Sequence, residues 1–152
     1  MIQRAKHRDL LAIMQLEEAG FPANERWSEQ LWREELEAGN HCVLVDRDEQ
    51  GVIRGVVTGH VVADVADVDR VIVAPDSWRQ GIGSALMAAI MEWAGKAGAE
   101  RLLLEVDAHN EAAIALYHSF GFQTLSFRAD YYGPGSDACV LGVSVALPVG
   151  DC

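Results

Sequence analysis

The stretch Val71-Ile-Val-Ala-Pro-Asp-Ser-Trp-Arg-Gln-Gly-Ile-Gly-Ser-Ala-Leu86 decides the fold of this chain. Its apolar start predicts a strand, and the spacing after Gly81 predicts an amphipathic helix. Gly81 and Gly83 carry no Cβ atom, so a ligand can approach their backbone closely. The start of a helix presents unpaired N–H groups and the positive end of a dipole. The stretch therefore predicts an anion site, most naturally one for a diphosphate group.

Two common phosphate-binding motifs do not fit this turn. A Walker loop needs Lys followed by Ser or Thr after its second glycine, and a dinucleotide fingerprint needs a third glycine near Leu86. The turn instead resembles the coenzyme A loop of the GNAT acetyltransferases, Gln/Arg-x-x-Gly-x-Gly/Ala, which reads here as Trp78-Arg-Gln-Gly81-Ile-Gly83. Tryptophan departs from that pattern at its first position. A plain strand–turn–helix without a coenzyme is the alternative interpretation.

A second match to this family follows an apolar strand at 102–106, in Asn110-Glu-Ala-Ala-Ile-Ala-Leu-Tyr117-His-Ser-Phe-Gly121-Phe122. Asn110 is a good N-cap for a helix, and Gly121 is a typical residue to end it. The string N-x-A-A-x-x-L-Y-x-x-x-G-F is specific to GNAT enzymes and stands at the expected distance from the glycine turn.

Further anchors make the chain similar to one GNAT subfamily, the bacterial ribosomal-protein alanine N-acetyltransferases. The resemblance extends from about Gln3 to Pro148. Its anchors are Phe21-Pro22, Trp27-Ser28-Glu29, Leu104-Glu105-Val106, the Asn110 string, Asp130-Tyr131-Tyr132 and Asp137-Ala138.

Three departures from the subfamily pattern stand out. Residues 23–26 separate Phe-Pro from Trp-Ser, which are contiguous in that family, and Asp107 stands where arginine is common. Ala74 precedes Pro75 where an acidic residue is usual. The first two leave the identity of the acceptor open, and none of the three affects the transfer chemistry.

The periodicity along the chain predicts one α/β domain spanning residues 1–152. Its expected order is β-α-α-β-β-β-α-β-α-β-β, a mixed sheet with helices on both faces. The expected strands are 2–4, 43–46, 52–62, 66–73, 102–107, 122–128 and 138–146, and the expected helices are 7–19, 29–39, 82–97 and 110–120. The GNAT resemblance implies the same acyl-CoA N-acyltransferase fold, with a splay between the fourth and fifth strands that admits the pantetheine arm of the coenzyme.

Apolar spacing also predicts which helix residues face the core. They are Leu10, Ile13, Met14 and Leu16 or Glu17 in the first helix; Leu31, Trp32 and Leu36 in the second; Ile82, Leu86, Ile90, Trp93 and Ala97 in the third; and Ala113, Leu116, Tyr117 and Phe120 in the fourth.

The resemblance implies acetyl-CoA as the coenzyme. The backbone of 71–73 (Val71, Ile72 and Val73) would run beside the pantetheine amides, with Asn110 nearby. The residues that would surround the diphosphate are Arg79, Gln80, Gly81, Ile82, Gly83 and Ser84. Arg79 and the helix start would offset the repulsion between an acidic chain and an anionic coenzyme.

Direct acetyl transfer to an amine needs an acid for the departing thiolate and a base for the ammonium. Tyr117 is the expected acid, because a phenol with a pKa of about 10 can protonate a thiolate with a pKa of about 8.5. Glu105 is the expected base, since a carboxylate in an apolar strand is costly to bury unless it is paired or used. Asp107 either shares that site or caps the next helix. A core tyrosine without a catalytic role is the alternative for Tyr117.

The resemblance implies that Phe21, Tyr131 and Tyr132 line the acceptor cleft. The sequence therefore predicts an acetyltransferase for a protein N-terminal α-amine, such as that of a ribosomal protein. A small-amine acetyltransferase acting on a polyamine, an amino acid or an aminoglycoside is one alternative. A non-catalytic acyl-CoA sensor is the other, and it would need neither Glu105 nor Tyr117.

Composition excludes several classes of function. A net charge of −11 and a pI near 4.7 argue against nucleic-acid binding, which needs clustered Lys and Arg. No apolar run reaches 18 residues, and the N-terminus lacks a signal-peptide core, so we expect no membrane association. Cys42, Cys139 and Cys152 form an odd set that predicts a reducing cytoplasm. We expect a monomer or weak homodimer.

Two groups of polar side chains are expected to be solvent-exposed and without a specific function. Acidic residues gather in the first two helical stretches and predict a solvated face, with steering of a cationic acceptor as the alternative; they are Glu17, Glu18, Glu29, Glu34, Glu35 and Glu37. The five histidines show no ligand spacing and are expected on the surface or in loops, so the sequence predicts no metal site. They are His7, His41, His60, His109 and His118.

Overall fold

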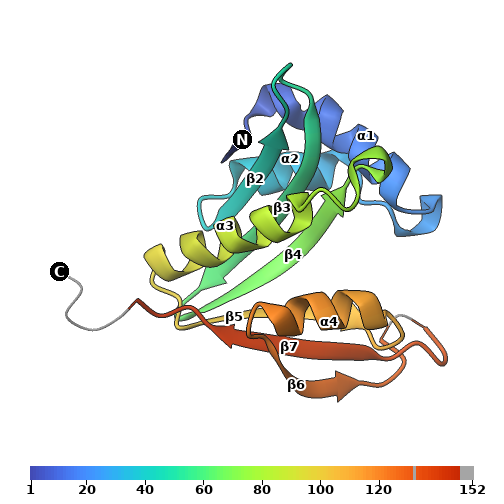
Figure 1. Ribbon diagram of the computed structural model, residues 1–152, viewed down its shortest axis with the longest axis vertical. Coiled ribbons are helices and arrows are strands. Elements are labelled where there is room, and N and C mark those ends of the chain that lie inside the picture. Colours follow the sequence, from blue (N-terminus) through green and yellow to red (C-terminus); the bar gives the residue numbers. More distant parts are fainter. Residues whose placement is uncertain (132, 148–152) are drawn as a thin grey trace.

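The computed structural model describes residues 1–131 and 133–147 of the chain (Figure 1). Its strands are β1 (Ile2–Arg4), β2 (His41–Arg47), β3 (Ile53–Val62), β4 (Val65–Val73), β5 (Arg101–Asp107), β6 (Gln123–Arg128) and β7 (Ala138–Ser144). Its α-helices are α1 (Leu10–Gly20), α2 (Glu29–Glu37), α3 (Ile82–Lys96) and α4 (Glu111–Ser119), and its 3-10 turns are His7–Asp9, Ala23–Glu25 and Pro75–Ser77. The predictions for Tyr132 and Cys152 fall outside the described residues.

The seven strands form one mixed sheet in the order β1-β2-β3-β4-β5-β7-β6. All neighbouring strands run antiparallel except β4 and β5, which are parallel. The predicted element order is therefore confirmed, and so is the GNAT-type fold class. The parallel pair lies in the middle of the sheet, so the chain must cross over between them, and α3 is that crossover.

Helices cover both faces of the sheet (Figure 1). The first helical pair, α1 and α2, packs one face of β2–β4 through a cluster centred on Ile13, Trp32, Val45 and Val56. The other face carries α3 and α4 over a larger cluster, which contains Leu86, Ile90, Leu102, Phe122 and Leu141. Helices thus cover both faces of β2–β4, in agreement with the many apolar residues of these strands.

Both predicted N-caps are present. The Ser28 hydroxyl accepts a hydrogen bond from the Leu31 N–H, and the Asn110 side chain accepts one from the Ala113 N–H. Gly121 follows α4 with φ of 93°, the left-handed conformation that a terminating glycine supplies. These local signals place the two helices that flank the site described below.

Three predicted core positions are wrong. Leu31 and Leu116 are 38% and 40% exposed, and Ala97 is exposed just after the end of α3. In α2 the inward face is formed by Trp32 and Glu35 instead. The short α4 has no fully buried residue, because it covers only the narrow part of the sheet formed by β5 and β7. The apolar spacing therefore predicted the buried face of each helix correctly but included residues at the margin of that face that are exposed.

Candidate active site

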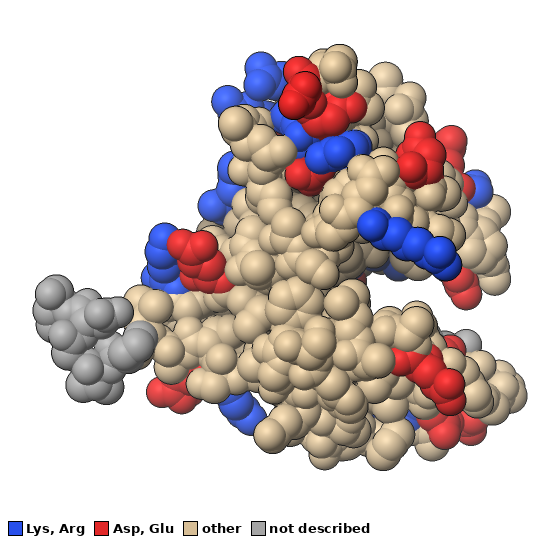
Figure 2. Space-filling model, in the orientation of Figure 1, with Lys and Arg blue, Asp and Glu red and all other residues tan. Residues whose placement is uncertain are grey.

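The central parallel strands pair only at their starts. Residues 65–67 of β4 are in register with 101–103 of β5, and beyond that point the strands separate. The strands nevertheless continue to Val73 and Asp107, so a wedge-shaped slot opens between their carboxyl ends. The space-filling view shows a hollow between the part of the molecule that carries α3 and the part that carries α4 (Figure 2). Acidic and basic side chains both lie along its rim.

The peptide groups of β4 that face this slot belong to Val71 and Val73. The Ala74 N–H donates to the Arg54 carbonyl across the β3–β4 ladder. Because hydrogen-bonding direction alternates along a strand, Ile72 also faces β3, whereas Val71 and Val73 face β5. They have no strand partner there among the described residues, since the β4–β5 pairing ends at Asp67.

The glycine turn closes the outer end of the slot. Arg79 and Gly81 have φ of 66° and 77°, so the turn takes the left-handed conformation twice, and Gly81 is the N-cap of α3. The first N–H groups of a helix have no intrahelical partner. Open space surrounds the position where a Cβ of Gly81 would lie. The turn therefore leaves room for an anion above the start of α3.

Trp78, the position that departs from the GNAT pattern, has a definite place. Its indole Nε1 donates a hydrogen bond of 2.9 Å to the Val73 carbonyl, and its side chain is 63% exposed. A slot-facing carbonyl of β4 is thus already engaged by a residue of the loop. This contact could not be predicted from the sequence, because it depends on how the loop folds back over the strand.

Tyr117 lies on α4 and faces the core beside the slot. Its ring packs against Phe122 with a centroid separation of 5.9 Å and an interplanar angle of 61°. Burial raises the pKa of its hydroxyl above the usual value. The phenol therefore stays protonated throughout the neutral range, as a proton donor must.

Glu105 points to the opposite face of β5. Its neighbours Leu104 and Val106 are buried toward α3 and α4, so alternation directs the Glu105 carboxylate to the other side. There it accepts a hydrogen bond of 2.6 Å from Arg128 Nη1. The hydroxyl of Tyr131 also hydrogen-bonds to Glu105, and this bond, with the nearby charge of Glu105, raises the pKa of Tyr131. Arg128 in turn lies 4.3 Å from the Tyr131 ring centroid.

Asp107 does not join Glu105 in this group. Its Oδ1 accepts a hydrogen bond of 2.8 Å from the His109 N–H, and its carbonyl accepts one from the Asn110 N–H. Asp107 thus shapes the turn before α4, which supports the capping interpretation of this residue.

A buried ion pair lies on the same face of the sheet, between α1 and β4. Glu17, which is fully buried, accepts hydrogen bonds of 3.0 and 2.9 Å from Arg70 in β4. It also accepts from the Trp32 indole and the Trp27 N–H. The Arg70 guanidinium lies 3.5 Å from the Phe21 ring centroid. Phe21 is therefore held against β4.

The inserted segment that distinguishes the chain from its subfamily pattern folds back on this wall. Residues 23–25 form a 3-10 turn, and the Glu25 carbonyl accepts a hydrogen bond of 2.9 Å from Arg70. Arg26 donates to the carbonyls of Phe21 and Glu18. The insertion thus lies tied to α1 beside the predicted acceptor cleft.

Two predictions about polar residues are corrected here. Glu17 and Glu35 belong to the acidic helices but are buried, because each faces a partner on the sheet: Arg70 for Glu17 and His41 for Glu35. His41 and His60 are half-buried strand residues rather than surface or loop histidines. The burial of Glu17 had one indication in the sequence, because this residue falls within the apolar spacing of the first helix.

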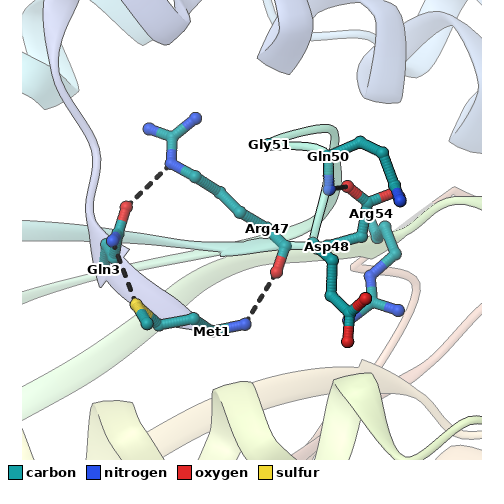
Figure 3. Close-up of a pocket in the computed structure, with 8 residues that line it drawn as sticks. Met1, Gln3, Arg47, Asp48, Gln50, Gly51 and Arg54 are labelled. Carbon is teal, nitrogen blue, oxygen red and sulfur yellow. Dashed lines mark hydrogen bonds between the residues drawn. The ribbon is translucent and has the colours of Figure 1, made fainter.

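A separate hollow lies at the far end of β2 and β3, near the chain start (Figure 3). Its polar groups bind one another: Arg47 Nε donates to Gln3, and the terminal amine of Met1 donates to the Arg47 carbonyl. None of the residues predicted to act in catalysis or coenzyme binding lines it. We therefore assign the chemistry to the slot between β4 and β5.

Comparison with known proteins agrees with this geometry. The protein-family model described as the Acetyltransferase (GNAT) family matches residues 10–122, a span that contains the slot, the glycine turn and α4. The chain belongs to the GNAT acetyltransferase family. It is an acetyltransferase, and the family implies the use of acetyl-CoA.

Individual GNAT relatives cover almost the whole chain. The ribosomal protein bS18-alanine N-acetyltransferase of Escherichia coli (strain K12) is 34% identical over 143 residues, which are 93% of this chain and 92% of that protein. The crystal structure of the ribosomal-protein-S18-alanine N-acetyltransferase from Escherichia coli superposes with a TM-score of 0.87 and 28% identity, covering 100% of this chain and 97% of that chain. A ribosomal-protein-alanine N-acetyltransferase structure from Brucella melitensis, at 22% identity and a TM-score of 0.82 over 95% and 99% of the two chains, shows the shared fold.

Charged residues of β4 and β6 also contact the candidate site residues but were not predicted from the sequence. Asp67, Asp69 and Arg70 interrupt an otherwise apolar strand, which is a signal of use or pairing in a buried element. Arg128 has no such signal, because its role depends on the β6–β7 hairpin bringing it opposite Glu105.

The Glu17–Arg70 pair leads to a stability prediction. Replacing Arg70 by Met leaves the buried Glu17 carboxylate without its cation, which costs about 3–5 kcal/mol. For a chain of this size the Tm should fall on the order of 10 °C. The measurement is thermal unfolding followed by circular dichroism.

The matched control is Arg33→Met, which removes an exposed arginine from its 3.6 Å pair with Glu29. Exposed pairs contribute about 1 kcal/mol or less. Adding Glu17→Gln to Arg70→Met should recover part of the lost stability, because the uncompensated charge is gone. Equal effects of the Arg70 and Arg33 variants would contradict the assignment.

Proposed function

We propose that this enzyme transfers the acetyl group of acetyl-CoA to the N-terminal α-amine of a protein that begins with alanine, with ribosomal protein bS18 as the leading acceptor. The support for the acceptor is the Escherichia coli relative, whose name states that specificity and which aligns over 93% of this chain. The observation that supports the reaction is that Glu105 leaves one face of β5, whereas Tyr117 packs into the core on the other face.

Coenzyme binding follows from the exposed peptide groups at the slot. The backbone of Val71 and Val73 would pair with the pantetheine amides, as an added strand does at a sheet edge. The N–H groups at 81–84 would bind the diphosphate at the start of α3, with Arg79 supplying positive charge. Asn110 would stand beside the pantetheine at the start of α4. Trp78 would border the same channel through its bond to the Val73 carbonyl.

The acceptor would approach from the face that carries α1 and α2. Phe21, which contacts Arg70 of β4, and Tyr131, which hydrogen-bonds to Glu105 of β5, would line this approach. We also assign Tyr132, next in the chain, to the acceptor cleft on the strength of the family resemblance. Carboxyl groups crowd together on this face: burial, and the charges of Asp69 and Glu105 nearby, raise the pKa of Asp67. Such a surface attracts a positively charged ammonium group.

The reaction needs no covalent enzyme intermediate. Glu105, directly or through a water, takes a proton from the acceptor ammonium, and the free amine attacks the thioester carbonyl carbon to form a C–N bond. A slot-facing N–H of β4 stabilises the oxyanion, a contribution on the order of 3 kcal/mol per donor. Collapse of the tetrahedral intermediate breaks the C–S bond, and Tyr117 donates its proton to the departing thiolate. The base and the acid thus act on opposite sides of the slot.

A small cationic amine is the second candidate acceptor. The observation that favours it is the acidic group formed by Asp67, Asp69 and Glu105, which a polyamine would also satisfy. For either acceptor we place the reaction in the cytoplasm, and the free, buried Cys42 and Cys139 fit a reducing compartment. We expect the enzyme to act as a monomer or weak homodimer.

The first test compares two peptides with the N-terminal sequence of bS18, one with a free alanine amine and one N-blocked. We expect CoA release from acetyl-CoA with the free peptide only, because only that peptide presents an α-amine. A third reaction with spermidine tests the second candidate. Turnover with spermidine and not with the free peptide would overturn the proposed acceptor.

Tyr117→Phe should lower kcat by about 10²–10⁴-fold, the usual contribution of a general acid. Acetyl-CoA binding, measured by calorimetry, should stay close to that of the unmodified enzyme, since the phenyl ring still packs against Phe122. Unchanged kcat in this variant would remove Tyr117 from the mechanism.

Glu105→Gln should abolish the acidic limb of the kcat/KM profile against pH. In the unmodified enzyme, kcat/KM falls as the pH drops and the base becomes protonated, whereas glutamine has no proton to gain. The measurement is kcat/KM across the pH range with the free peptide. Persistence of the same limb in the variant would assign the base to another group, with Asp67, whose charge interacts with that of Glu105, the first carboxylate to examine.

A further inference from the structure

A second group of polar side chains lies between α2 and the sheet and shares Asp69 with the acidic face described above. It combines residues from four elements: Glu35 of α2, His41 of β2, His60 of β3 and Asp69 of β4. One potential metal-binding atom from each of His41, His60 and Asp69 lies within 4.8 Å of the other two. These residue types are the nitrogen and oxygen ligands that zinc accepts.

The backbone fixes the two histidines side by side. His41 and His60 are directly opposite each other in the β2–β3 register, so their side chains must leave the same face of the sheet. Their rings stack with a centroid separation of 5.1 Å and an interplanar angle of 22°. Neither ring needs a large movement to present a nitrogen to a shared ion.

A strand irregularity brings the carboxylate to them. The β3–β4 register shifts between Thr58 and Gly59, which pair with Arg70 and Val68, so Asp69 is the extra residue of a bulge. The Asp69 Oδ2 atom lies 2.7 Å from His60 Nδ1. Bulges redirect single side chains, and this one turns a carboxylate toward the histidine pair.

Glu35 completes the group from the helix side. Its side chain is 6% exposed, and its Oε2 contacts His41 Nδ1. Both of these atoms are buried, and each is the polar partner of the other. A cation that both side chains bind would replace this direct contact.

The charge of the group points the same way. Glu35 and Asp69, with Asp67 at the rim 3.7 Å from His60 Nε2, place three carboxylates around two imidazoles. In the described part of the chain, the ion-pair partners of these carboxylates are histidines and never Lys or Arg. Balancing the carboxylates with protons would put two imidazolium charges in stacked rings. A single divalent cation balances them without that repulsion.

We propose that His41, His60 and Asp69, with Glu35 as the fourth ligand, bind a divalent cation of the zinc class. A tetrahedral zinc site with bonds near 2.1 Å has ligand atoms roughly 3.4 Å apart. The separations among His41, His60 and Asp69, which reach up to 4.8 Å, therefore need a closure on the order of 1 Å, while the 2.7 Å Asp69–His60 contact and the direct Glu35–His41 contact must open. The side chains of His41, His60 and Asp69 are 22–27% exposed, so an ion can enter from solvent.

Such a cation would tie α2 to three strands. Residues 21–26, which include Phe21 of the proposed acceptor cleft, lie directly before α2 in the chain. By holding α2 on the sheet, the cation would also help to hold this segment in place. The proposal does not depend on which amine the enzyme acetylates, since its readouts are metal content and stability.

The test uses untagged, chelator-treated protein, because an affinity tag of histidines would itself bind metal. Zinc is added, and calorimetry and elemental analysis of the desalted protein give the affinity and stoichiometry. We expect one zinc ion per chain and a Tm rise of about 5 °C or more at a hundredfold excess over Kd. Co²⁺ should give the visible absorption of a tetrahedral site, and Mg²⁺ should not bind comparably.

His60→Ala should weaken zinc binding by more than the roughly 10- to 100-fold typical of lost supporting contacts. Asp69→Asn, which keeps the side-chain shape, should also weaken it and covers the case in which His60→Ala does not fold. The matched control is His7→Ala, which removes an exposed histidine that also faces a glutamate, Glu37, at 3.7 Å. Substoichiometric zinc, equal affinity in the His60, Asp69 and His7 variants, or equal binding of Mg²⁺ would overturn the proposal.

Discussion

The structure depends on the point where β4 and β5 stop pairing. A buried peptide group without a partner costs about 1–3 kcal/mol, so proteins avoid ending a ladder in the middle of a sheet. Here the ladder ends after Asp67 and Leu103 although both strands continue. The cost is tolerable because the exposed groups of Val71 and Val73 face an open slot, where solvent or an extended ligand can satisfy them. The same break that weakens the sheet creates an edge to which a pantetheine arm can add.

Keeping the slot open requires that β4 be held from its other side. Arg70 does this, because its guanidinium lies between the buried Glu17 of α1 and the Phe21 ring. The pair joins the first helix, the segment that follows it and the strand beside the slot into one unit. A buried ion pair contributes little net stability relative to an apolar contact but is specific in geometry. In the proposed mechanism the Glu17–Arg70 pair would therefore position Phe21 beside the acceptor rather than strengthen the core.

The fold could be read almost completely from the sequence, because its signals are local. Apolar runs, the caps at Ser28 and Asn110, and the glycines at 81 and 121 each act within a few residues. The site could be read only in part. Glu105 and Tyr117 stand in strings specific to the family, whereas the partners of Glu105, namely Arg128 and Tyr131, depend on a hairpin that brings distant residues together. The prediction that His41 and His60 lie on the surface or in loops was wrong for the same reason. The two residues are neighbours through the cross-strand register, which spacing along the chain does not encode.

The distribution of charge ties these features to the chemistry. An enzyme with a net charge of −11 must bind an anionic coenzyme and a cationic amine, and uniform acidity would favour only the amine. The fold separates the two demands by face. On the α3 side the helix start and Arg79 present positive potential to the diphosphate, while on the α1–α2 side Asp67, Asp69 and Glu105 gather negative charge. Because the slot lies between these two faces, each substrate would bind the face that suits its charge, and the two would react between β4 and β5.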